Sequence, residues 1–486
     1  MVLKRSTVTI LIILSMIIGA VLSITIVNWS TSIFAEQDET EQETMKEETK
    51  DTFGFTETDL KKMSTVFGII GNDYYKEMDK TEIIDGAIRG MLASLDDPYT
   101  VYYDAEQSKM FREAVNSSIT GIGAEVTMED NRVTVVSPIK DSPAEQAGIR
   151  AKDQIISVNG ESLEGLTLND AVLKIRGPKG TQAKLEILRS GFNETIEIIV
   201  VRDQIDIETI QSEMLEGNIG YIEIKQFSQH TSDRFHEDLT QLESEGLQSL
   251  IIDVRNNPGG FLDTAIELLD PLLEEGKIIV QVEDRQGNRQ ETRSKQGGKP
   301  YSIVVLTNNG SASASEILAG AIRESADGII VGENTFGKGT VQNTFPSGVN
   351  DGSELKVTIA KWLTPNGNFI NEVGIEPDYI VEQPAFYTVA PLRKDEVLSL
   401  ESVGENVKTL QIMLESLGFN PERSDGFFDV KTEAALKNFQ AENGLSVTGK
   451  VDELTANEIE KQIIAKFNDP ENDYQLQKAI KVLSGS

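Results

Sequence analysis

The alternation of apolar and polar positions divides the chain into segments of different character. Residues 7–27 are almost continuously apolar, and residues 36–51 are rich in Glu, Gln, Thr and Lys. This pattern predicts a hydrophobic helix followed by a solvated tether that reaches residue 54. Apolar side chains then recur at helical spacing: Leu60, Met63, Val66, Phe67 and Ile70. They predict a small helical module over residues 55–116, and residues 95–100 have the composition of its terminating turn.

The next two segments combine strands with helices. Within residues 117–203 the strand-like runs are residues 132–138, 154–158, 183–189 and 195–201, and short helical patterns cover residues 142–148 and 168–175. Within residues 204–385 the predicted strands are residues 220–224, 250–254, 301–306 and 328–332. They alternate with helical patterns at residues 235–243, 262–273 and 315–324. This alternation predicts an α/β core in which strand ends can hold a functional site.

Residues 395–466 form a last, mostly helical segment, in which Val407, Leu410 and Leu414 make one apolar stripe. Residues 467–486 are polar, and we expect them to be a tail. A chain of 486 residues is too long for one hydrophobic core. We therefore predict a multidomain α/β protein with a helical N-terminal module, a small β-rich domain, an α/β core and a small all-α C-terminal domain.

The first 35 residues have the features of a membrane anchor. Lys4 and Arg5 precede an apolar run of about 20 residues, which is long enough to span a bilayer as a helix. The basic flank predicts an internal N-terminus and an external body. We therefore expect a single-pass protein of the cell membrane with extracytoplasmic domains. A cleaved signal peptide is the alternative, with Ile33-Phe34-Ala35 as a candidate cleavage site.

Composition excludes several classes of function. The formal net charge is −34, which argues against a nucleic-acid partner because phosphate neutralisation needs surplus Lys and Arg. The chain has no cysteine, so disulfides, thiolate metal sites and a Cys nucleophile are excluded. The only two histidines are His230 and His236, near Asp233 and Asp238, without a third close ligand of the usual kind. We interpret this stretch as a solvated helix face and predict no metal site.

A hydrolase without a usable His or Cys can pair a serine nucleophile with a lysine base. The lysine must be held neutral by burial, because desolvation disfavours the ammonium form. In residues 304–316 an apolar strand runs into small residues, including Ser311, Ser313 and Ser315, and then into a helix. Free N–H groups at the start of a helix favour developing negative charge. In residues 332–342 Lys338 lies between two glycines, with Gln342 near enough to orient its amine.

These two segments resemble the catalytic motifs of the carboxy-terminal processing, or tail-specific, serine peptidases. The resemblance covers roughly residues 55–385, and its motifs fall in order. The further motifs are Gly217-Asn-Ile-Gly-Tyr-Ile-Glu-Ile-Lys-Gln-Phe227, Asp253-Val-Arg-Asn-Asn-Pro-Gly-Gly260, Thr364-Pro-Asn-Gly-Asn-Phe-Ile370 and Gly374-Ile-Glu-Pro-Asp378. The resemblance implies a serine endopeptidase core over residues 204–385, for which we expect no cofactor.

The resemblance also implies the roles of the candidate catalytic residues. Carried over by position, Ser313 is the nucleophile, and only the family motif distinguishes it from Ser311 and Ser315. Lys338 is then the general base that takes the proton of Ser313 and returns it to the leaving amine. Gln342 is expected to orient Lys338.

The same resemblance implies an oxyanion hole and two supporting residues. The oxyanion hole is expected to use the backbone N–H of Ala314 with one from Gly259 or Gly260. Glu316 and Thr335 also match family positions, and we expect them to hold the site rather than to react.

Residues 117–203 resemble a PDZ domain. The motifs are Gly121-Ile-Gly-Ala-Glu-Val126, Ser142-Pro-Ala-Glu-Gln-Ala-Gly-Ile149, Asp153-Gln-Ile-Ile-Ser-Val-Asn-Gly160 and Ile175-Arg-Gly-Pro-Lys-Gly180. Ile122, Gly123 and Ala124 are the candidate N–H groups for a substrate's free C-terminal carboxylate, while the peptide adds a strand to the sheet edge. Arg176 is a candidate coupler of peptide occupancy to the protease core. A PDZ fold kept for architecture alone, and a solvated Arg176, are the alternatives.

Residues 395–466 resemble a small helical peptidoglycan-binding domain. The matching segments are Val403-Gly-Glu-Asn-Val-Lys-Thr-Leu-Gln411, Leu417-Gly-Phe419, Asp425-Gly-Phe-Phe-Asp429, Thr432, Phe439-Gln440, Gly444-Leu445 and Thr448-Gly449. The resemblance implies peptidoglycan as a partner. Asp425-Gly426 also occurs in calcium loops, but the remaining EF-hand spacing is absent.

Two other classes of function stay open at this stage. One is a non-enzymatic PDZ adaptor at the cell wall. The other is a cell-wall hydrolase, against which the lack of a zinc ligand set, a Cys nucleophile and a convincing glycosidase carboxylate pair argues. The resemblance also makes a homodimer, formed through the helical module and the core, plausible.

Overall fold

The computed structural model describes residues 54–129, 131–139, 142–189, 195–348, 350–394 and 396–485. The predicted membrane segment and all but the last residue of the tether lie outside these ranges, so both stay predictions. The chain divides into two compact units, residues 1–88 and residues 89–486. In the described part of the first unit, helix α2 (Glu57–Asp73) begins at a capping box between Thr56 and Asp59 and has no buried residue. Helix α3 (Lys80–Ala93) begins in this unit and ends in the second.

The second unit opens with strand β1 (Val101–Tyr103) and helix α4 (Ala105–Val115), which Asp104 caps. Strand β1 pairs antiparallel with strand β18 (Glu354–Leu363) of the later core, with Val101 opposite Lys356. The predicted helical module therefore contributes a strand to the core, which the helical periodicity around it did not indicate.

The β-rich domain has strands close to the predicted ones. They are β3 (Ala124–Glu129), β4 (Arg132–Pro138), β5 (Gln154–Val158), β6 (Glu161–Ser162), β7 (Gln182–Leu188) and β8 (Ile196–Val201), with helices α5 (Pro143–Gln146) and α6 (Leu168–Ile175). The sheet order is β3-β4-β5-β7-β8, so β3 is an edge strand. Strands β2 (Ser118–Gly121) and β9 (Asp203–Asp206) pair where the chain enters and leaves the domain.

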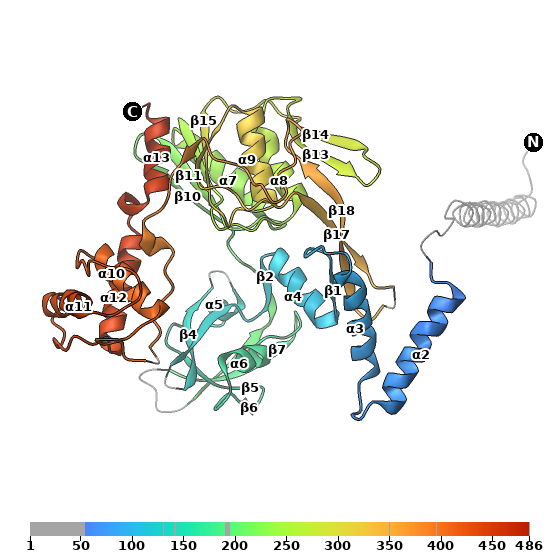
Figure 1. The fold of residues 1–486 in the computed structure, drawn as a ribbon, viewed down its shortest axis with the longest axis horizontal. Coiled ribbons are helices and arrows are strands. Elements are labelled where there is room, and N and C mark those ends of the chain that lie inside the picture. Colours follow the sequence, from blue (N-terminus) through green and yellow to red (C-terminus); the bar gives the residue numbers. More distant parts are fainter. Residues whose placement is uncertain are drawn as a thin grey trace, which may run out of the picture. The chain divides into compact units, whose positions relative to one another are not determined.

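The core contains a six-stranded sheet (Figure 1). Its strands, in spatial order, are β10 (Ile210–Leu215), β11 (Ile219–Ile224), β12 (Ser249–Asp253), β15 (Ser302–Thr307), β16 (Ile329–Gly332) and β19 (Tyr379–Ile380). All pairs except β10–β11 are parallel. Parallel strands covered on both faces are continuously apolar, as in Leu250, Ile251 and Ile252, all fully buried.

One face of this sheet packs against helices α7 (Thr231–Ser244), α8 (Leu262–Leu269) and α9 (Ala314–Ser325). The predicted helix over residues 262–273 changes after Leu269 into the 3₁₀ turn η1 (Asp270–Leu272), because Pro271 lacks the N–H that an α-helix needs.

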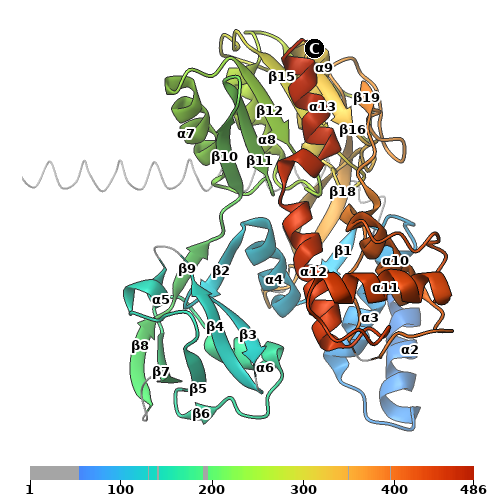
Figure 2. The same ribbon diagram turned by 90° about the vertical axis from the view of Figure 1, so that its left-hand side faces the viewer.

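The other face of the sheet is covered by the end of the chain. After the 3₁₀ turn η3 (Pro470–Asn472), helix α13 (Tyr474–Leu483) packs Leu476 and Ala479 against buried side chains of the sheet, including Ile251. Figure 2 shows α13 running along the strands. The expectation of a polar tail over residues 467–486 was therefore wrong for the helical part. Helix α13 has apolar residues at helical spacing, including Leu476, Ala479, Ile480 and Leu483, and the sequence analysis overlooked this pattern.

The core also contains a second sheet. It contains β1, β13 (Ile278–Asp284), β14 (Arg289–Arg293), β17 (Thr340–Pro346) and β18, in the order β1-β18-β13-β14 with β17 also paired to β18. The sequence analysis did not predict it. Strand β17 begins two residues after Lys338, and this sheet therefore fixes the segment that holds the candidate base.

The C-terminal helical domain consists of α10 (Glu405–Ser416), α11 (Val430–Glu442) and α12 (Glu453–Phe467), preceded by the 3₁₀ turn η2 (Ala385–Tyr387). Its own core includes Val407, Leu410 and Leu414, which are fully buried as the apolar stripe predicted. Within the part of the chain that the structure describes, none of the helices combines the length and the hydrophobicity needed to span a bilayer.

Candidate active site

Ser313 occupies the sharp turn between strand β15 and helix α9. Its backbone has φ 55° and ψ −112°, a conformation that L-residues rarely adopt and that is found where a structure holds a reacting group in place. The hydroxyls of Ser311 and Ser315 donate to the carbonyls of Val254 (2.8 Å) and Asn257 (2.9 Å), and both serines are fully buried. Of these three serines, only Ser313 lines the cavity that also contains Lys338.

Lys338 lies in the segment between β16 and β17. Its carbonyl accepts a hydrogen bond of 2.8 Å from the indole N–H of the buried Trp362, which fixes the backbone. Burial lowers the pKa of Lys338 to about 8, with a further lowering by the charge of Lys356; Glu316 and Asp97 act in the opposite direction. The pKa is therefore close to that of an amine that can serve as a base near neutral pH.

Ser313 and Lys338 line one cavity of about 690 Å³, together with Gly259, Gly260 and Gln342. No hydrogen bond joins the Ser313 hydroxyl to the Lys338 amine in the described chain. The Lys338 amine lies 4.9 Å from the ring centroid of Tyr99. Catalytic hydrogen bonds are often long without substrate, so the arrangement allows the two groups to meet when a peptide fills the cavity.

Glu316 connects the segments of the two candidate catalytic residues. Its buried carboxylate accepts hydrogen bonds from the backbone N–H of Ser313 (2.8 Å), Gly337 (2.7 Å) and Lys338 (2.9 Å). It also accepts one of 2.6 Å from the hydroxyl of Thr335, which in turn accepts the N–H of Ile375 at 2.7 Å. These contacts support the predicted holding role of Glu316 and Thr335.

The glycine turn packs against Ser313. A Cβ atom added to Gly259 would lie 2.9 Å from the Cβ of Ser313 and 3.0 Å from the nitrogen of Ala314, so a side chain has no space here. The Gly259 N–H already donates to the Asn257 side chain at 2.9 Å. In the described chain the N–H groups of Gly260 and Ala314 have no acceptor. Of the two predicted glycine donors, Gly260 is therefore the one with a free N–H.

Gln342 lies in the same cavity, but its amide is turned to strand β18. Its side-chain nitrogen donates to the hydroxyls of Thr340 (2.8 Å) and Thr358 (3.3 Å). These bonds do not include Lys338, so the orienting role of Gln342 stays a prediction.

Three residues near Lys338 were missed by the sequence analysis: Asp97, Tyr99 and Lys356. Hydrogen bonds outweigh the burial of Asp97 and lower the pKa of its carboxyl group, so it is an anion near Lys338. Lys356 lines the cavity, and burial lowers the pKa of its amine. The sequence pattern around Asp97 and Tyr99 predicts only a turn, because its spacing does not relate these residues to Lys338.

The candidate peptide site of the β-rich domain lies beside its edge strand. Gly123 has φ 80°, and a Cβ atom there would lie 2.4 Å from the Cβ of Ser142, so this turn requires glycine. In the described chain the N–H groups of Ile122 and Gly123 have no acceptor. Ala124 begins the edge strand β3, to which a peptide could pair.

Arg176 directly follows helix α6 and faces helix α4. Its guanidinium lies 3.5 Å from the carboxylate of Glu113, and its stem lies 3.7 Å from the position of a Cβ on Gly121. The structure thus places Arg176 against helix α4, rather than leaving it fully solvated.

The two histidines are apart from this site. His230 lies 4.0 Å from Asp206, and His236 is on helix α7. The described residues contain no group of three or more His, Cys, Asp or Glu side chains that could hold a metal ion.

Comparison with known proteins identifies the family. The family model "Peptidase family S41" matches residues 218–381. Three other models match: "Activating protease CtpB N-terminal domain" at residues 16–107, "PDZ domain" at residues 120–200 and "Putative peptidoglycan binding domain" at residues 403–459.

Relatives agree with these matches. The carboxy-terminal processing protease CtpB of Bacillus subtilis is 43% identical over 428 residues, covering 87% of this chain and 89% of that protein. The protease CtpA of the same organism is 41% identical over 423 residues, covering 87% and 90%. A solved photosystem II D1 C-terminal processing protease is 31% identical, with a TM-score of 0.40, covering 66% of this chain and 86% of that one. The chain is a serine-type peptidase, and it belongs to the carboxy-terminal processing proteases of family S41.

Proposed function

We propose that this peptidase is an endopeptidase in which Lys338 activates Ser313, and that its PDZ domain selects protein substrates by their C-terminal tails. The principal support is the cavity that contains both groups. Ser313 reaches it from a strained turn, and Lys338 reaches it with a pKa of about 8.

The proposed reaction uses the groups that line this cavity. The neutral amine of Lys338 takes the proton of the Ser313 hydroxyl, and the Ser313 oxygen attacks the scissile carbonyl carbon. The N–H groups of Ala314 and Gly260 donate to the resulting oxyanion, and loss of one such donor typically costs about 3 kcal/mol of transition-state stabilisation. The Lys338 ammonium then gives its proton to the leaving amine, and water hydrolyses the acyl-enzyme.

Tail selection is assigned to the edge strand β3 and the turn before it. A C-terminal segment can add a strand along β3 while its carboxylate accepts hydrogen bonds from the N–H groups of Ile122, Gly123 and Ala124. Arg176 is proposed to transmit the occupancy of this site to the protease core.

The location is proposed from the two ends of the chain. The apolar run over residues 7–27 would anchor the protein in the cell membrane with its domains outside, and the C-terminal domain would bind peptidoglycan. Detergent-dependent release of the full chain from membranes tests the anchor. A mature N-terminus after Ala35 would instead favour a cleaved signal.

A homodimer is proposed on the surface of α2. This helix has no buried residue, and its exposed apolar side chains include Leu60, Met63, Val66 and Ile69. Such a stripe is available for pairing with a second copy. Light scattering of the full chain and of a Met63→Glu, Val66→Glu variant tests this; an unchanged mass would contradict a dimer through α2.

The central experiment compares wild type with Ser313→Ala and Lys338→Ala on a disordered protein that has either a free or an amidated C-terminus. We expect both variants to lose cleavage by at least about 10³-fold, and wild type to prefer the free terminus. Lys361→Ala, which removes a lysine paired with Glu283, is the matched control and should stay active.

The same assay separates the alternatives. Full proteolysis by Ser313→Ala would place the nucleophile elsewhere or favour a PDZ adaptor. Release of fragments from purified cell wall, without cleavage of the protein substrate, would favour a cell-wall hydrolase.

A further inference from the structure

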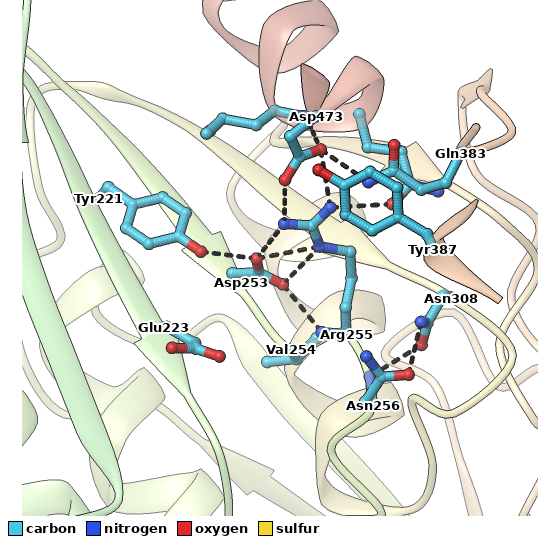
Figure 3. Close-up of polar contacts among 12 residues, drawn as sticks. Tyr221, Glu223, Asp253, Val254, Arg255, Asn256, Asn308, Gln383, Tyr387 and Asp473 are labelled. Atoms are coloured by element: carbon cyan, nitrogen blue, oxygen red, sulfur yellow. Dashed lines mark hydrogen bonds and ion pairs between the residues drawn. The ribbon is translucent and has the colours of Figure 1, made fainter. Parts of the chain in front are cut away.

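A buried charge network of the core lies away from the Ser313 cavity, at the side where α13 begins (Figure 3). The Arg255 guanidinium makes hydrogen bonds to two carboxylates, Asp253 and Asp473. The bonds to Asp473 measure 2.9 and 2.8 Å and use two different nitrogens, so this pair is bidentate. The side chains of Arg255 and Asp473 are each 13% exposed.

The contacts of Arg255 and Asp473 keep both groups ionised despite their burial. Burial by itself lowers the pKa of Arg255, but the charges and hydrogen bonds of Asp253 and Asp473 hold that pKa well above its ordinary value. Burial would raise the pKa of Asp473, but the hydrogen bond and charge of Arg255 keep it below its ordinary value. The Arg255 guanidinium and the Asp473 carboxylate are therefore both charged at neutral pH, and loss of the Asp473 charge removes one of the two carboxylates that the buried guanidinium contacts.

Arg255 belongs to the turn that forms the oxyanion side of the active site. Two residues further on, Asn257 donates to Ile224, receives the Gly259 N–H on its side chain and receives the Ala312 N–H on its carbonyl. Asn256, between them, is joined to Asn308 by two hydrogen bonds of 2.8 Å. Arg255 is thus two residues from Asn257, which accepts hydrogen bonds from Ala312 and Ser315 on the two sides of Ser313.

Asp473 belongs to a different part of the chain. It caps the N-terminus of α13 by accepting the Leu476 N–H at 2.9 Å, and it accepts a bond of 2.7 Å from Gln383. Six residues earlier, Phe467 ends the last helix of the peptidoglycan-binding domain, and its ring packs on Tyr387 with centroids 4.6 Å apart. The Arg255–Asp473 pair therefore joins the oxyanion turn to the segment that leaves the C-terminal domain.

We infer that Asp473, acting through Arg255, is a positioning residue for the oxyanion turn, and that residues 470–485 are a functional part of the protease. This inference deepens the proposed function and rests on it. The apolar contacts of Leu476 and Ala479 bury α13 against the sheet but are non-directional. The bidentate pair fixes the orientation of Arg255 relative to Asp473, because a guanidinium can donate two hydrogen bonds to one carboxylate in only a few geometries.

Loss of the Asp473 carboxylate should weaken stabilisation of the transition state more than it weakens substrate binding. Without the Asp473 carboxylate, Arg255 keeps Asp253 and its single bond of 3.1 Å to Gln475 on α13, but it loses the bidentate contact that orients its guanidinium, and the turn with Gly259 and Gly260 gains freedom. Displacement of a catalytic donor by about 1 Å can cost about 100-fold in rate. Peptide binding along β3 and in the cavity uses other groups, so KM should stay unchanged.

The test uses the full-length chain with Asp473→Asn, which keeps the shape and the capping oxygen but removes the charge. Asp469→Asn is the matched control, since this exposed carboxylate caps the preceding turn and makes no bond to Arg255. The measurements are kcat and KM on a peptide, the inhibition constant of a peptidyl boronic acid, which mimics the tetrahedral intermediate, and the melting temperature. Rates are divided by the concentration of sites titrated with the boronic acid.

We expect Asp473→Asn to lower kcat by between about tenfold and about 100-fold and to weaken boronic-acid binding in parallel, with KM unchanged. Partial unfolding alone would reduce the number of titrated sites and leave the inhibition constant of the remaining sites unchanged. Equal kcat and equal inhibition constants in Asp473→Asn, Asp469→Asn and wild type would overturn the inference.

Arg255→Lys tests the route through Arg255. A lysine keeps the charge but cannot donate bidentate hydrogen bonds to two carboxylates, so Arg255→Lys should reproduce the effect of Asp473→Asn. The kcat of the double variant should be no lower than that of Arg255→Lys alone. Additive losses would overturn the route. If wild type itself does not bind the boronic acid, or if Ser313→Ala hydrolyses the peptide like wild type, then the proposed function has failed instead.

Discussion

At the scale of single residues, the electrostatic surroundings of Lys338 decide what its amine can do. Burial and the nearby charge of Lys356 lower the pKa of the amine, while Glu316 and Asp97 limit the decrease. The Tyr99 ring, 4.9 Å from the amine, also favours the charged form. The resulting pKa of about 8 keeps a usable fraction of neutral amine near neutral pH and leaves it basic enough to take a serine proton.

The pH dependence of cleavage follows from this pKa. Only the neutral amine accepts the proton of Ser313, so kcat/KM should rise with pH and level off above a midpoint near pH 8. Below the midpoint the rate should fall about tenfold for each pH unit. The measurement is kcat/KM on an uncharged peptide across this range. A profile without this midpoint would contradict Lys338 as the base.

Two neighbouring charges should move that midpoint in opposite directions. Lys356→Gln removes a positive charge that disfavours the Lys338 ammonium, so the midpoint should move to higher pH. Asp97→Asn removes an anion that favours the ammonium, so the midpoint should move to lower pH. Lys361→Gln is on the same strand as Lys356 but pairs with Glu283, and it should leave the midpoint in place. Shifts of the same sign in both variants would contradict this assignment.

At the scale of secondary-structure elements, one carboxylate holds two chain segments together. Helix α9 begins beside Ser313, and the segment before β17 contains Lys338. The Glu316 carboxylate on α9 accepts hydrogen bonds from the backbone N–H groups of Ser313 and Lys338. The backbones of Ser313 and Lys338, the proposed nucleophile and base, are therefore positioned by the same group.

Loss of the Glu316 contacts should impair activity before the fold is lost. Thr335→Val removes a donor to Glu316 and an acceptor for Ile375, which should lower the free energy of unfolding by about 1–3 kcal/mol. Glu316→Gln replaces a carboxylate, whose two oxygens both accept hydrogen bonds, with an amide. The NH₂ group of this amide would face the N–H and O–H donors that the carboxylate binds. We expect it to lower kcat by at least about 100-fold in protein that is still folded. Glu324→Gln, on the same helix, should leave kcat unchanged; equal kcat in Glu316→Gln would contradict the holding role.

Elements with a complete local pattern could be predicted from the sequence. Strands β4 and β5 and helix α6 occur at the predicted residues, and the core strands agree within one or two residues. Period-2 alternation and continuous apolar runs are properties of neighbouring residues, so they can be recognised without the fold. The family resemblance supplied Ser313 and Lys338, which spacing alone did not distinguish from ordinary turn residues.

The missed elements depend on partners that are distant in the sequence. Helix α13 is short, and its position depends on the sheet side chains that it covers and on Arg255, 218 residues before Asp473. Strand β18 begins with alternating polar and apolar residues over 354–359, which the sequence analysis overlooked, but its pairing with β1 on one side and β17 on the other could not be predicted from that alternation. Asp97 and Tyr99 acquire a role only when this pairing brings them to Lys338. No local rule relates residues that only the tertiary fold makes neighbours.

At the scale of the second compact unit, helix α4 lies between the PDZ domain and the catalytic core. Glu113 on α4 faces Arg176, and the next residue, Ala114, accepts a bond of 2.8 Å from Gln226 of the core. Gln226 precedes Phe227, whose N–H donates to Gly259 at 3.0 Å and whose carbonyl accepts the Phe261 N–H at 2.8 Å. A continuous series of contacts therefore joins Arg176 to the oxyanion turn.

This series predicts the effect of Arg176→Ala. Site-to-site coupling typically changes affinity or activity by about 5- to 150-fold, so we expect the preference of wild type for a free over an amidated C-terminus to fall by about tenfold or more. Cleavage of a peptide too short to occupy the PDZ domain should change less, because the catalytic groups are intact. Lys174→Ala is the matched control, since Lys174 is on the same helix but pairs with the exposed Glu161. Unchanged tail preference in Arg176→Ala would show that peptide occupancy reaches the core by another route, such as a rigid movement of the whole PDZ domain.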